Sequence, residues 1–478
     1  MAAMIRFHNT LSGRVEDFVP IEPGRVKLYT CGPTVYDYPH IGNWRAYIFE
    51  DLLKRLLKYR GFEVTHVMNL TDVDDKTIRD SRARTVAELQ AYTRKYIEAF
   101  YAERDTLRIL PADHYPRATE FVPEMVGLIK VLLAKGFAYR KDGSVYFAID
   151  KFPAYGRLAK IDLEDLRPGA RGDADEYEKE SVHDFALWKG PKEGEPFWET
   201  EVGPGRPGWH IECSAMSSKY LGPTFDIHCG GVDNIFPHHE NEIAQSEAAN
   251  GVKFVNYWLH CHHLVVDGEK MAKSKGNFYR LSDILARGYD PAEVRFLLLS
   301  THYRKMLNFT DEALQQARTS RNRVRNFLFE LRHIERALPP VPAVAEAIET
   351  ARADFVAGLE DDLNISESLA ALFELVKCVN ILVGQGEVGK EDAERVIGVI
   401  REIDAKVLAC LGVEESVPSG ADAFETLIQD KIEARQKARA AKDFKRADEI
   451  RKELLEAGIV LEDTKDGVRW KRVGPAKP

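Results

Sequence analysis

The chain has 478 residues, of which 44% are hydrophobic and 30% are charged. A chain of this length exceeds one ordinary core and predicts about two to four globular domains. Its net charge of -9 gives no compositional support for a nucleic-acid partner, so any RNA would have to bind local patches. No apolar run approaches the roughly 18 residues of a membrane span, and the first residues lack a secretion signal, so we expect no membrane contact and a cytoplasmic protein.

The cysteines are too dispersed for a disulfide framework in so long a chain, and no CxxC pair is present. Any chemical use of them requires residues that are distant in sequence to meet in the fold. The six cysteines are Cys31, Cys213, Cys229, Cys261, Cys378 and Cys410.

The first predicted elements form the start of a parallel α/β sheet. Apolar and polar residues alternate from Val26 to Thr30 and meet a turn at 31–34, the pattern of a buried strand that ends in a loop. A helix follows, which Gly61 is suited to end in a left-handed cap, and residues 62–70 predict a second strand. Apolar residues recur at helical spacing in between: Ile48, Leu52, Leu53, Leu56 and Leu57. Strand, helix and strand in this order predict a right-handed parallel unit.

The rest of the chain divides into an insertion and several helical parts. Residues 111–207 are interpreted as an insertion, because their second half is crowded with Gly, Pro and charges and shows little periodicity. Helical periodicity covers 281–334, and the proline-rich residues 338–342 predict a stiff linker. A second boundary is predicted at 417–420, followed by a long helix and a short strand-like tail that ends near Trp470.

The loop His40-Ile-Gly-Asn43 stands at the start of the first predicted helix, where free backbone NH groups and the helix dipole favour a phosphate. Gly42 would allow a nucleotide to approach closely. A histidine there can donate hydrogen bonds to charge that grows in a transition state. Turn and capping residues have the same composition, so this loop alone leaves both interpretations open.

A second loop, Lys270-Met-Ala-Lys-Ser274 followed by Lys275-Gly-Asn277, carries three lysines. Their charge could hold a pyrophosphate and stabilise a pentacoordinate phosphate during acyl activation. A solvated basic turn has the same residues, and the pattern in isolation does not separate the two interpretations.

A third group of residues suits a metal ion. His238 and Glu242 lie four residues apart, and the proline before them suits a first helical position, so their side chains are expected on one helix face. Together with Cys31 and Cys213 they form an acceptable zinc set, although the long separations lack zinc-finger spacing. His239 is three residues from Glu242, so spacing leaves the choice of histidine open. Buried cysteines and capping histidines would need no metal.

Other charged residues favour structural interpretations or leave the matter open. Three acids, Asp72, Asp74 and Asp75, predict a capped helix start, and magnesium is expected to arrive with ATP. Two arginine-rich stripes at helical spacing suit phosphates, and solvated helix faces carry the same pattern. The stripes are Arg318, Arg321 and Arg325, and Arg435, Arg439, Lys442 and Arg446.

Five segments in order resemble the cysteinyl-tRNA synthetase family, and the tail VLEDTKDGVRWKR extends the resemblance over nearly the whole chain. The segments are TCGPTVYDYPHIGN, NLTDVDDKT, GRPGWHIECSAMS, DIHCGGVDNIFPHHENEIAQSE and EKMAKSKGN. The resemblance implies a cysteine–tRNA ligase that converts cysteine and ATP to cysteinyl adenylate and transfers the cysteinyl group to the 3′ end of tRNA(Cys).

The resemblance implies that HIGN and KMAKS are the HIGH and KMSKS signatures of class I synthetases. Asn43 replaces a histidine and Ala272 a serine, whereas both signature lysines are kept. The implied catalytic residues are His40, Asn43, Lys270 and Lys273. The implied ATP-binding residues are His40, Gly42, Asn43, Asp233 and Lys273, with Mg²⁺ carried by ATP.

The resemblance also implies one zinc ion held by Cys31, Cys213, His238 and Glu242, which resolves the choice of histidine and binds the substrate thiolate directly. Soft sulfur on zinc favours cysteine over serine, so rejection by about 10⁴-fold without editing is expected. Two further implied substrate contacts are Thr71, at the backbone groups of the amino acid, and Trp209, as a wall of the pocket.

The implied architecture is a Rossmann-like parallel-sheet catalytic domain with an insertion, then a helical bundle and a small anticodon-binding domain. The expected domains are 1–110 with 208–280 (catalytic), 111–207 (connective insertion), 281–336 (stem contact), 343–416 (bundle) and 421–478 (anticodon). The implied tRNA-binding residues are Arg439, Phe444, Asp448 and Asp463, and a monomer is expected. The alternatives are a cysteine ligase that acts on a small amino sugar and a catalytically silent RNA- or zinc-binding relative.

Overall fold

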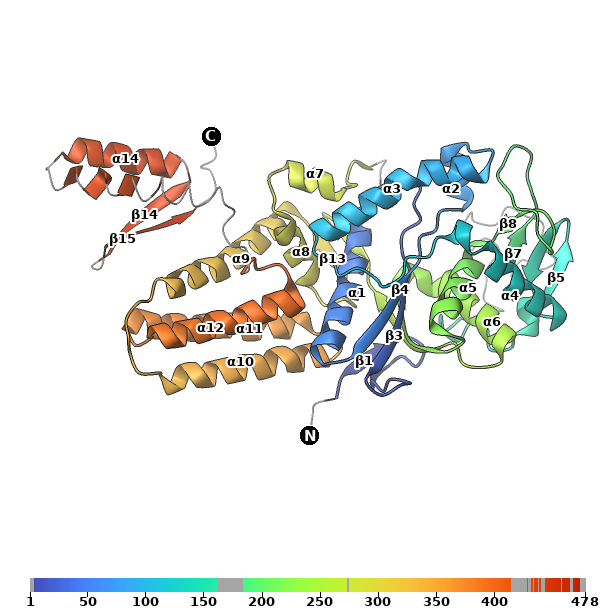
Figure 1. Cartoon of the computed structure of the whole chain (residues 1–478), viewed down its shortest axis with the longest axis horizontal. Coiled ribbons are helices and arrows are strands. Elements are labelled where there is room, and N and C mark those ends of the chain that lie inside the picture. The colour runs from blue at the N-terminus through green and yellow to red at the C-terminus, as the bar shows by residue number, and fades with distance from the viewer. Residues whose placement is uncertain are drawn as a thin grey trace.

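The computed structural model describes residues 4–161, 184–272 and 275–413 and, beyond them, 428, 431–432, 434–436, 438–439, 443–456, 458–464 and 467–472. Figure 1 shows a helical bundle towards one end, a small antiparallel sheet at the other and an α/β region between them. None of the helices in the described ranges is both long enough and apolar enough to span a bilayer.

The central sheet has four parallel strands in the order β10-β9-β3-β4. Their bounds are β3 (Arg25–Thr30), β4 (Glu63–Met68), β9 (Phe225–Gly231) and β10 (Val255–Cys261). β3 and β4 are the two predicted strands, and the predicted open parallel sheet is confirmed. The chain proceeds outward from β3 to β4 on one side and from β9 to β10 on the other. The connections after β3 and after β9 therefore run in opposite directions along the sheet. Open α/β sheets bind their ligands at the carboxyl ends of two such strands.

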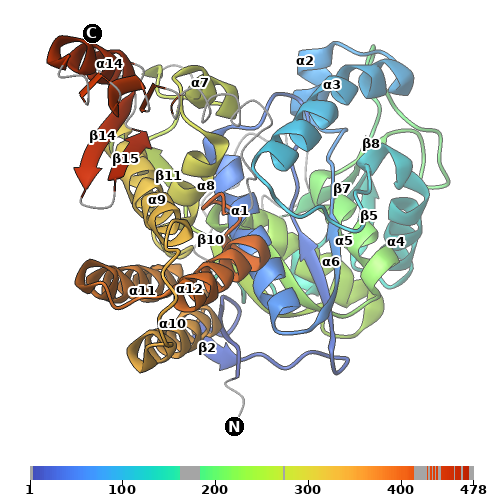
Figure 2. The same ribbon diagram turned by 60° about the vertical axis from the view of Figure 1, so that its left-hand side comes forward.

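Helix α1 (Ile41–Tyr59) connects β3 to β4 and starts with the HIGN loop. The five apolar positions that predicted it are all buried, because this helix lies inside the molecule rather than at its surface. Gly61 has φ +88°, a left-handed conformation that suits glycine just after the helix end, as expected. His40 is the N-cap residue of this largely buried helix, in the segment that connects the carboxyl end of β3 to α1. Figures 1 and 2 show α1 beside the central strands.

The insertion contains an ordered antiparallel sheet, β5-β6-β7-β8, beside helix α4 (Val122–Ala134). Its strands are β5 (Ala138–Lys141), β6 (Ser144–Phe147), β7 (Phe185–Lys189) and β8 (Arg206–Pro207). β7 is buried at all five residues, so it lacks the alternation that marks a half-exposed strand. This absence of alternation explains why sequence periodicity did not reveal it.

The remaining elements of the first 270 residues include two strand pairs outside the central sheet, β1 with β2 and β11 with β12. They are β1 (Arg6–Asn9), β2 (Arg14–Asp17), α2 (Asp75–Ser81), α3 (Val86–Thr106), α5 (Trp209–Leu221), α6 (Glu240–Asn250), β11 (Leu264–Val266) and β12 (Glu269–Lys270). Short helical turns are η1 (Ala118–Glu120), η2 (Ile149–Lys151), η4 (Val232–Asn234) and η5 (Ile235–His239). Helices α5 and α6 carry residues of the candidate metal site into the interior.

The predicted helical region after residue 281 is interrupted by a short strand, β13 (Leu307–Phe309), which pairs in parallel with β11. The helices are α7 (Leu281–Ala286), α8 (Pro291–Leu299), α9 (Asp311–Arg332), α10 (Pro342–Glu360), α11 (Ile365–Gln385) and α12 (Lys390–Ile403), with η7 (Asp404–Leu408) after them. Figure 2 shows α10, α11 and α12 as a bundle beside α9. The predicted domain boundaries stay predictions.

Arginines of the first stripe make contacts within the protein. Arg321 is 1% exposed and its Nε donates to the carbonyl of Cys410 at 2.7 Å. Arg318 pairs with Glu293 at 2.9 Å. Arg321 is therefore not the phosphate contact or the solvated position that the sequence pattern suggested, because the end of the bundle covers it.

The C-terminal part contains helical residues between 428 and 439, helix α14 (Phe444–Glu456) and a hairpin of β14 (Ile459–Thr464) and β15 (Gly467–Arg472). The predicted long helix is interrupted at Asp443, whose carboxylate accepts a hydrogen bond from the amide of Arg446 at 3.0 Å. Aspartate commonly caps a new helix in this way. The predicted β-like tail is confirmed.

Candidate active site and metal centre

Several predicted site residues meet at the carboxyl ends of the central strands. Cys31 follows β3, Thr71 follows β4 by three residues, and Asp233 follows β9 within η4. The connections diverge between β3 and β9, so Cys31 and Asp233 follow the two strands between which open α/β sheets bind ligands.

The four proposed metal ligands come together. One ligand atom from each of Cys31, Cys213, His238 and Glu242 lies within 4.8 Å of the other three. Cys213 comes from α5 and Glu242 from α6, so three separate parts of the chain supply the donors. Two thiols, one imidazole and one carboxylate form a donor set that zinc accepts in tetrahedral geometry.

The chemistry of the cluster fits a cation. Glu242 Oε1 and His238 Nε2 lie 3.0 Å apart, yet this buried oxygen has no hydrogen bond among the described residues. Burial acts to lower the pKa of His238, but Cys213 and Glu242 outweigh it and raise this pKa to about 10. Burial acts to raise the pKa of Glu242, but His228 and His238 outweigh it and lower this pKa. The buried thiol and carboxylate groups thus stabilise a positive charge between them, as the ligands of a metal ion do.

Neighbouring groups orient His238 towards the cluster. Its Nδ1 lies 2.9 Å from Nδ1 of His210, so the other nitrogen, Nε2, faces Glu242. The Trp209 ring stacks on the His238 ring with centroids 4.2 Å apart. Pro237 does not start a regular helix as expected, because it lies inside the irregular turn η5 and α6 begins only at Glu240. The turn and α6 still place His238 and Glu242 side by side.

A second arrangement of ligands shares two of these residues. Atoms of Cys31, His228, His239 and Glu242 also lie within 4.8 Å of one another. In it, His239 Nε2 is 3.3 Å from the Cys31 sulfur and His228 Nε2 is 3.0 Å from Glu242 Oε2. Only the first set contains both thiols, which favours zinc there. His239 and His228 then lie beside the ligands as hydrogen-bonding neighbours.

Sequence reasoning missed most of the histidines around this cluster. His239 Nδ1 lies 2.8 Å from His260 Nε2, and His260 Nδ1 lies 2.7 Å from the Thr10 hydroxyl. Three of the missed histidines stand close to cysteines in the sequence, at His210, His228 and His260. That proximity was the available signal, but helix and strand periodicity alone could not show that these positions converge.

The HIGN loop has a different geometry from the one expected. The amides of Gly42 and Asn43 donate to Nδ1 of His40 at 3.1 and 3.3 Å, so these two NH groups are not free for a phosphate. Because Nδ1 accepts, the proton of a neutral His40 resides on Nε2, which is therefore a donor. Asn43 Oδ1 accepts from the His40 amide at 3.0 Å, which leaves its NH₂ group as the free end.

Neighbouring protein groups leave no room for a side chain at Gly42, whether or not a nucleotide is bound. A Cβ at this position would lie 2.9 Å from the His40 ring and 3.2 Å from Cε of Met271. Met271 belongs to the KMAKS loop, so the two signatures touch at Gly42. A side chain here would separate them.

The KMAKS loop is held from within by Asn277. Its Oδ1 accepts from the amide of Ala272 at 2.8 Å, and its Nδ2 donates to the carbonyl of Lys270 at 3.3 Å. Lys270 is exposed at the end of β12, and Lys273 lies outside the described residues. Sequence reasoning named the lysines but not the asparagine that closes the loop around them.

The predicted substrate residue Thr71 is buried, and its hydroxyl is hydrogen-bonded to two neighbouring side chains. Its hydroxyl donates to Glu212 Oε2 at 2.9 Å and accepts from Asn69 Nδ2 at 3.1 Å. Glu212 Oε1 is buried without a hydrogen bond among the described residues, and burial raises the pKa of Glu212 well above its ordinary value. Glu212 was missed by sequence reasoning, although it stands next to Cys213.

The acidic triplet is a capped helix start, as predicted. Asp74 accepts from the amide of Thr77 at 2.7 Å and caps α2. Asp72 accepts from the amide of Thr119 at 2.8 Å, and Asp75 pairs with Lys189 at 2.7 Å. Each carboxylate thus has a structural partner, which accounts for all three acids.

The predicted tRNA residues lie in the C-terminal part. Phe444 is 62% exposed at the start of α14, and Asp448 is exposed one turn later. Arg439 is exposed in the preceding helical residues. Asp463 lies in β14, and its side chain is outside the described residues.

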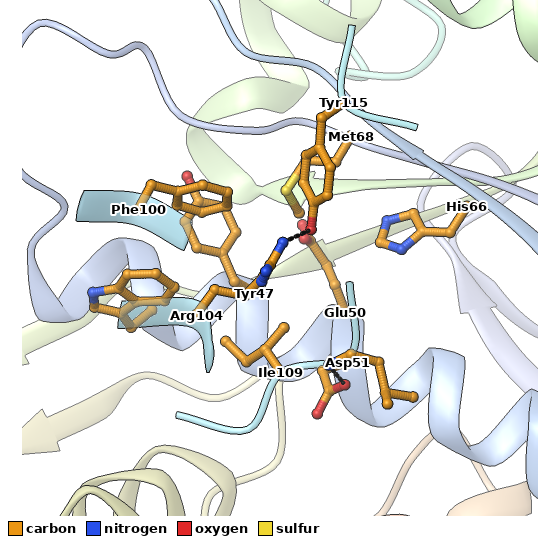
Figure 3. Close-up of a pocket in the computed structure, with 11 residues that line it drawn as sticks. Tyr47, Glu50, Asp51, His66, Met68, Phe100, Arg104, Ile109 and Tyr115 are labelled. Carbon is orange, nitrogen blue, oxygen red and sulfur yellow. Dashed lines mark hydrogen bonds between the residues drawn. The ribbon is translucent and has the colours of Figure 1, made fainter. Parts of the chain in front are cut away.

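A small cavity is lined partly by residues of α1 and by none of the four proposed metal ligands. Figure 3 shows Glu50 and His66 pointing into it, with Tyr115 bonded to Arg104 at 3.2 Å. The volume within which the centre of a water molecule can move is about 10 Å³. This is enough for a single bound water molecule. Neither carboxyl oxygen of Glu50 has a hydrogen bond of ordinary geometry in the described ranges, and burial raises the pKa of Glu50 well above its ordinary value. This cavity is too small for a nucleotide or an amino acid.

Solved structures share the fold. A methionyl-tRNA synthetase of Mycobacterium tuberculosis with methionyl-adenylate superposes with a TM-score of 0.60 over 80% of this chain and 92% of its own, at 16% identity. A putative arginyl-tRNA synthetase of Campylobacter jejuni gives 0.54 over 82% and 93%, at 13% identity. These likenesses establish the class I synthetase fold.

Family models cover most of the chain. The model described as tRNA synthetases class I (C) catalytic domain matches residues 17–319. A DALR domain model matches 354–412, and a cysteinyl-tRNA ligase anticodon binding domain model matches 428–470. These matches confirm the resemblance that the five sequence segments indicated.

Full-length relatives agree with these models. A cysteine–tRNA ligase of Solibacter usitatus is 47% identical over 98% of this chain and 99% of its own length. Those of Chlamydia muridarum and Leptospira interrogans are 48% identical over the same shares. With this identity along almost its entire length, the chain belongs to the cysteine–tRNA ligase family.

Proposed function

We propose that this chain activates L-cysteine with ATP and attaches it to tRNA(Cys). The observation that carries the proposal is the convergence of two thiols, a histidine and a glutamate, one of them directly after the carboxyl end of β3. The family membership supports the same activity.

We assign Cys31, Cys213, His238 and Glu242 as ligands of one zinc ion. Bound there, zinc would hold the thiolate of the substrate and favour sulfur over the harder hydroxyl of serine. Trp209 stacks on His238 and would form a wall of the amino-acid pocket beside the metal. The donor set and its charge support zinc over a hard cation, because two of the four donors are thiols.

The two signatures would act on MgATP. His40 would donate from Nε2 and Asn43 from its NH₂ group to the phosphates, while Lys270 and Lys273 would neutralise the departing pyrophosphate. Gly42 keeps the loops in contact, and Asp233 at the end of β9 is assigned to the adenosine side. The carboxylate of cysteine attacks the α-phosphate, pyrophosphate leaves, and cysteinyl adenylate forms.

In the second step, a hydroxyl of the terminal adenosine of tRNA attacks the cysteinyl carbonyl and AMP leaves. We assign Arg439, Phe444, Asp448 and Asp463 to recognition of the anticodon. Support comes from the exposure of Phe444, because base stacking on an open aromatic ring is a common mode of RNA recognition.

We also propose that the enzyme is a cytoplasmic monomer. All six cysteines are free, which suits a reducing compartment. Light scattering at working concentration would test the monomer, and a mass near twice 54.2 kDa would contradict it.

The decisive experiment is cysteine-dependent exchange of pyrophosphate into ATP, run on zinc-loaded and chelated enzyme with serine as a control. A parallel assay measures charging of tRNA. We expect both activities to need cysteine and zinc. Exchange without charging would indicate a ligase for a small acceptor, and the absence of exchange would contradict the proposed function.

A further inference from the structure

The segment that follows the KMAKS loop is docked on the HIGN loop. The amide of Ile41 donates to the carbonyl of Tyr279 at 3.0 Å, and His40 and Arg280 face each other as an antiparallel bridge. The Phe278 ring meets the His40 ring edge-on, with centroids 5.2 Å apart. Backbone and ring contacts thus join the two signatures.

The side chain of Arg280 adds two contacts to this junction. Its Nη2 donates to Asp37 Oδ1 at 2.9 Å, and its guanidinium carbon lies 4.8 Å from the centre of the Tyr38 ring. The side chains of Arg280 and Asp37 are 35% and 20% exposed, so the ion pair is partly shielded from solvent. Arg280 therefore contacts Asp37 and Tyr38, which stand just before His40 in the chain.

Helix capping does not account for an arginine at this position. Arg280 is the N-cap residue of α7, where Ser, Thr, Asp and Asn are preferred because their oxygens accept hydrogen bonds. A guanidinium group has no acceptor, and its charge lies near the positive end of the helix dipole. The helix start is instead completed by Asp283, which accepts from the Arg280 amide at 2.8 Å.

Arg280 also marks one of the two ends of the loop that carries the lysines. At the upstream end, Lys270 in β12 pairs with Val265 in β11. At the downstream end, the chain is held through Tyr279 and Arg280. Release of Arg280 would leave the downstream end attached by its backbone contacts and by the contact between the Phe278 and His40 rings.

We propose that Arg280 is a positioning residue for ATP in the activation step. Its contacts with Asp37 and Tyr38 hold the KMAKS loop against the HIGN loop, so that the signature lysines and His40 act on the same triphosphate. This inference rests on the proposed function. Arg280 acts through the two loops and makes no bond to the reacting atoms.

The test compares three variants in the pyrophosphate exchange assay, which needs no tRNA. R280S removes the contacts and supplies a preferred N-cap residue, so it separates loop positioning from helix capping. R280K keeps the charge and loses the planar guanidinium. R287S is the matched control, since Arg287 at the other end of α7 pairs with Asp311 and lies over the Tyr279 and Tyr289 rings but does not touch Asp37 or Tyr38.

We expect R280S to lower kcat/KM for ATP by about tenfold, the size expected when a partly exposed ion pair and a cation–π contact are lost together. The KM for cysteine and the zinc content should not change. R280K should recover part of the loss, and R287S should match the unmodified enzyme. In a double-mutant cycle, D37N should add little to R280S, because both variants remove the same contact.

Unchanged ATP kinetics in R280S would overturn this inference. So would an equal loss in R287S or simple additivity of D37N and R280S. Failure of the unmodified enzyme to catalyse exchange would instead overturn the proposed function, so the two failures are distinguishable.

Discussion

The hydroxyl of Thr71 donates a hydrogen bond of 2.9 Å to Oε2 of Glu212, and both side chains are buried. A hydroxyl has one proton, so towards a bound amino acid Thr71 can only accept. It is therefore suited to the ammonium group rather than the carboxylate of cysteine. Glu212 determines this polarity, and its second oxygen has no hydrogen bond among the described residues.

The first prediction follows from this polarity. E212L should raise the KM for cysteine by about 10- to 100-fold, the range for loss of a hydrogen bond that involves a charged group. 3-Mercaptopropionate, which lacks the amino group, should inhibit the variant and the unmodified enzyme equally well. E212Q keeps an acceptor and should lie between them. Equal losses for cysteine and for 3-mercaptopropionate would show that Glu212 acts on its neighbour Cys213 instead.

The second prediction concerns the metal. C213A should lose its zinc after dialysis, because one thiolate ligand is removed, and exchange should fall with it. C229A is the matched control, since Cys229 in β9 is as buried as Cys213 but belongs to neither set of ligands. Elemental analysis of both variants gives the zinc content. Retention of zinc in C213A, or its loss in C229A, would contradict the assigned ligands.

The third prediction separates the two roles of His40. H40S should keep α1 capped, because serine is a good N-cap residue, and so should leave the melting temperature nearly unchanged. Exchange should fall by about 10²- to 10³-fold, since the Nε2 donor to the phosphates is lost. Thermal melting and exchange kinetics on the same preparation would check both parts. A fall in melting temperature with little loss of exchange would make His40 a structural residue.

The fourth prediction concerns Phe444. F444A should raise the KM for tRNA by about 5- to 100-fold, the range for loss of one stacked base, and should spare pyrophosphate exchange. F444W should restore charging because either ring can stack. Charging kinetics at varied tRNA concentration measure the effect. If F444A impaired exchange instead, Phe444 would be a folding residue.

The fifth prediction concerns Glu50 in the small cavity. Burial raises the pKa of Glu50 well above 4.5, and the nearby Thr30 hydroxyl opposes this only in part. The folded state therefore holds this proton more tightly than the unfolded state. Its contribution to stability is complete below about pH 4.5 and is lost as the pH rises through the folded-state pKa.

E50Q should accordingly be more stable than the unmodified protein by a margin that grows from pH 5 to pH 8, as measured by thermal melting. E22Q is the contrasting control, because hydrogen bonding from Lys27 lowers the pKa of the exposed Glu22. The E22Q margin should not grow with pH. A constant margin for E50Q would mean that Glu50 has a partner that compensates its burial.

The sequence alone determined the features that depend on near neighbours. The alternation from Val26 to Thr30, the helical spacing of the apolar residues in α1 and the glycine at 61 all encode local backbone geometry, and the structure confirms each of them. The signature segments that carry the family resemblance are short contiguous stretches of sequence, so they could be identified without knowledge of the fold.

Only the tertiary structure decided which distant side chains meet. The cluster around Glu242 joins residues more than 200 positions apart, and no periodicity measures such separations. The same holds for His228 and His260 and for the contact of Arg280 with Asp37. The polarity of His40 and Thr71 was likewise undetermined in sequence, because a hydrogen-bond direction depends on the partner that folding supplies.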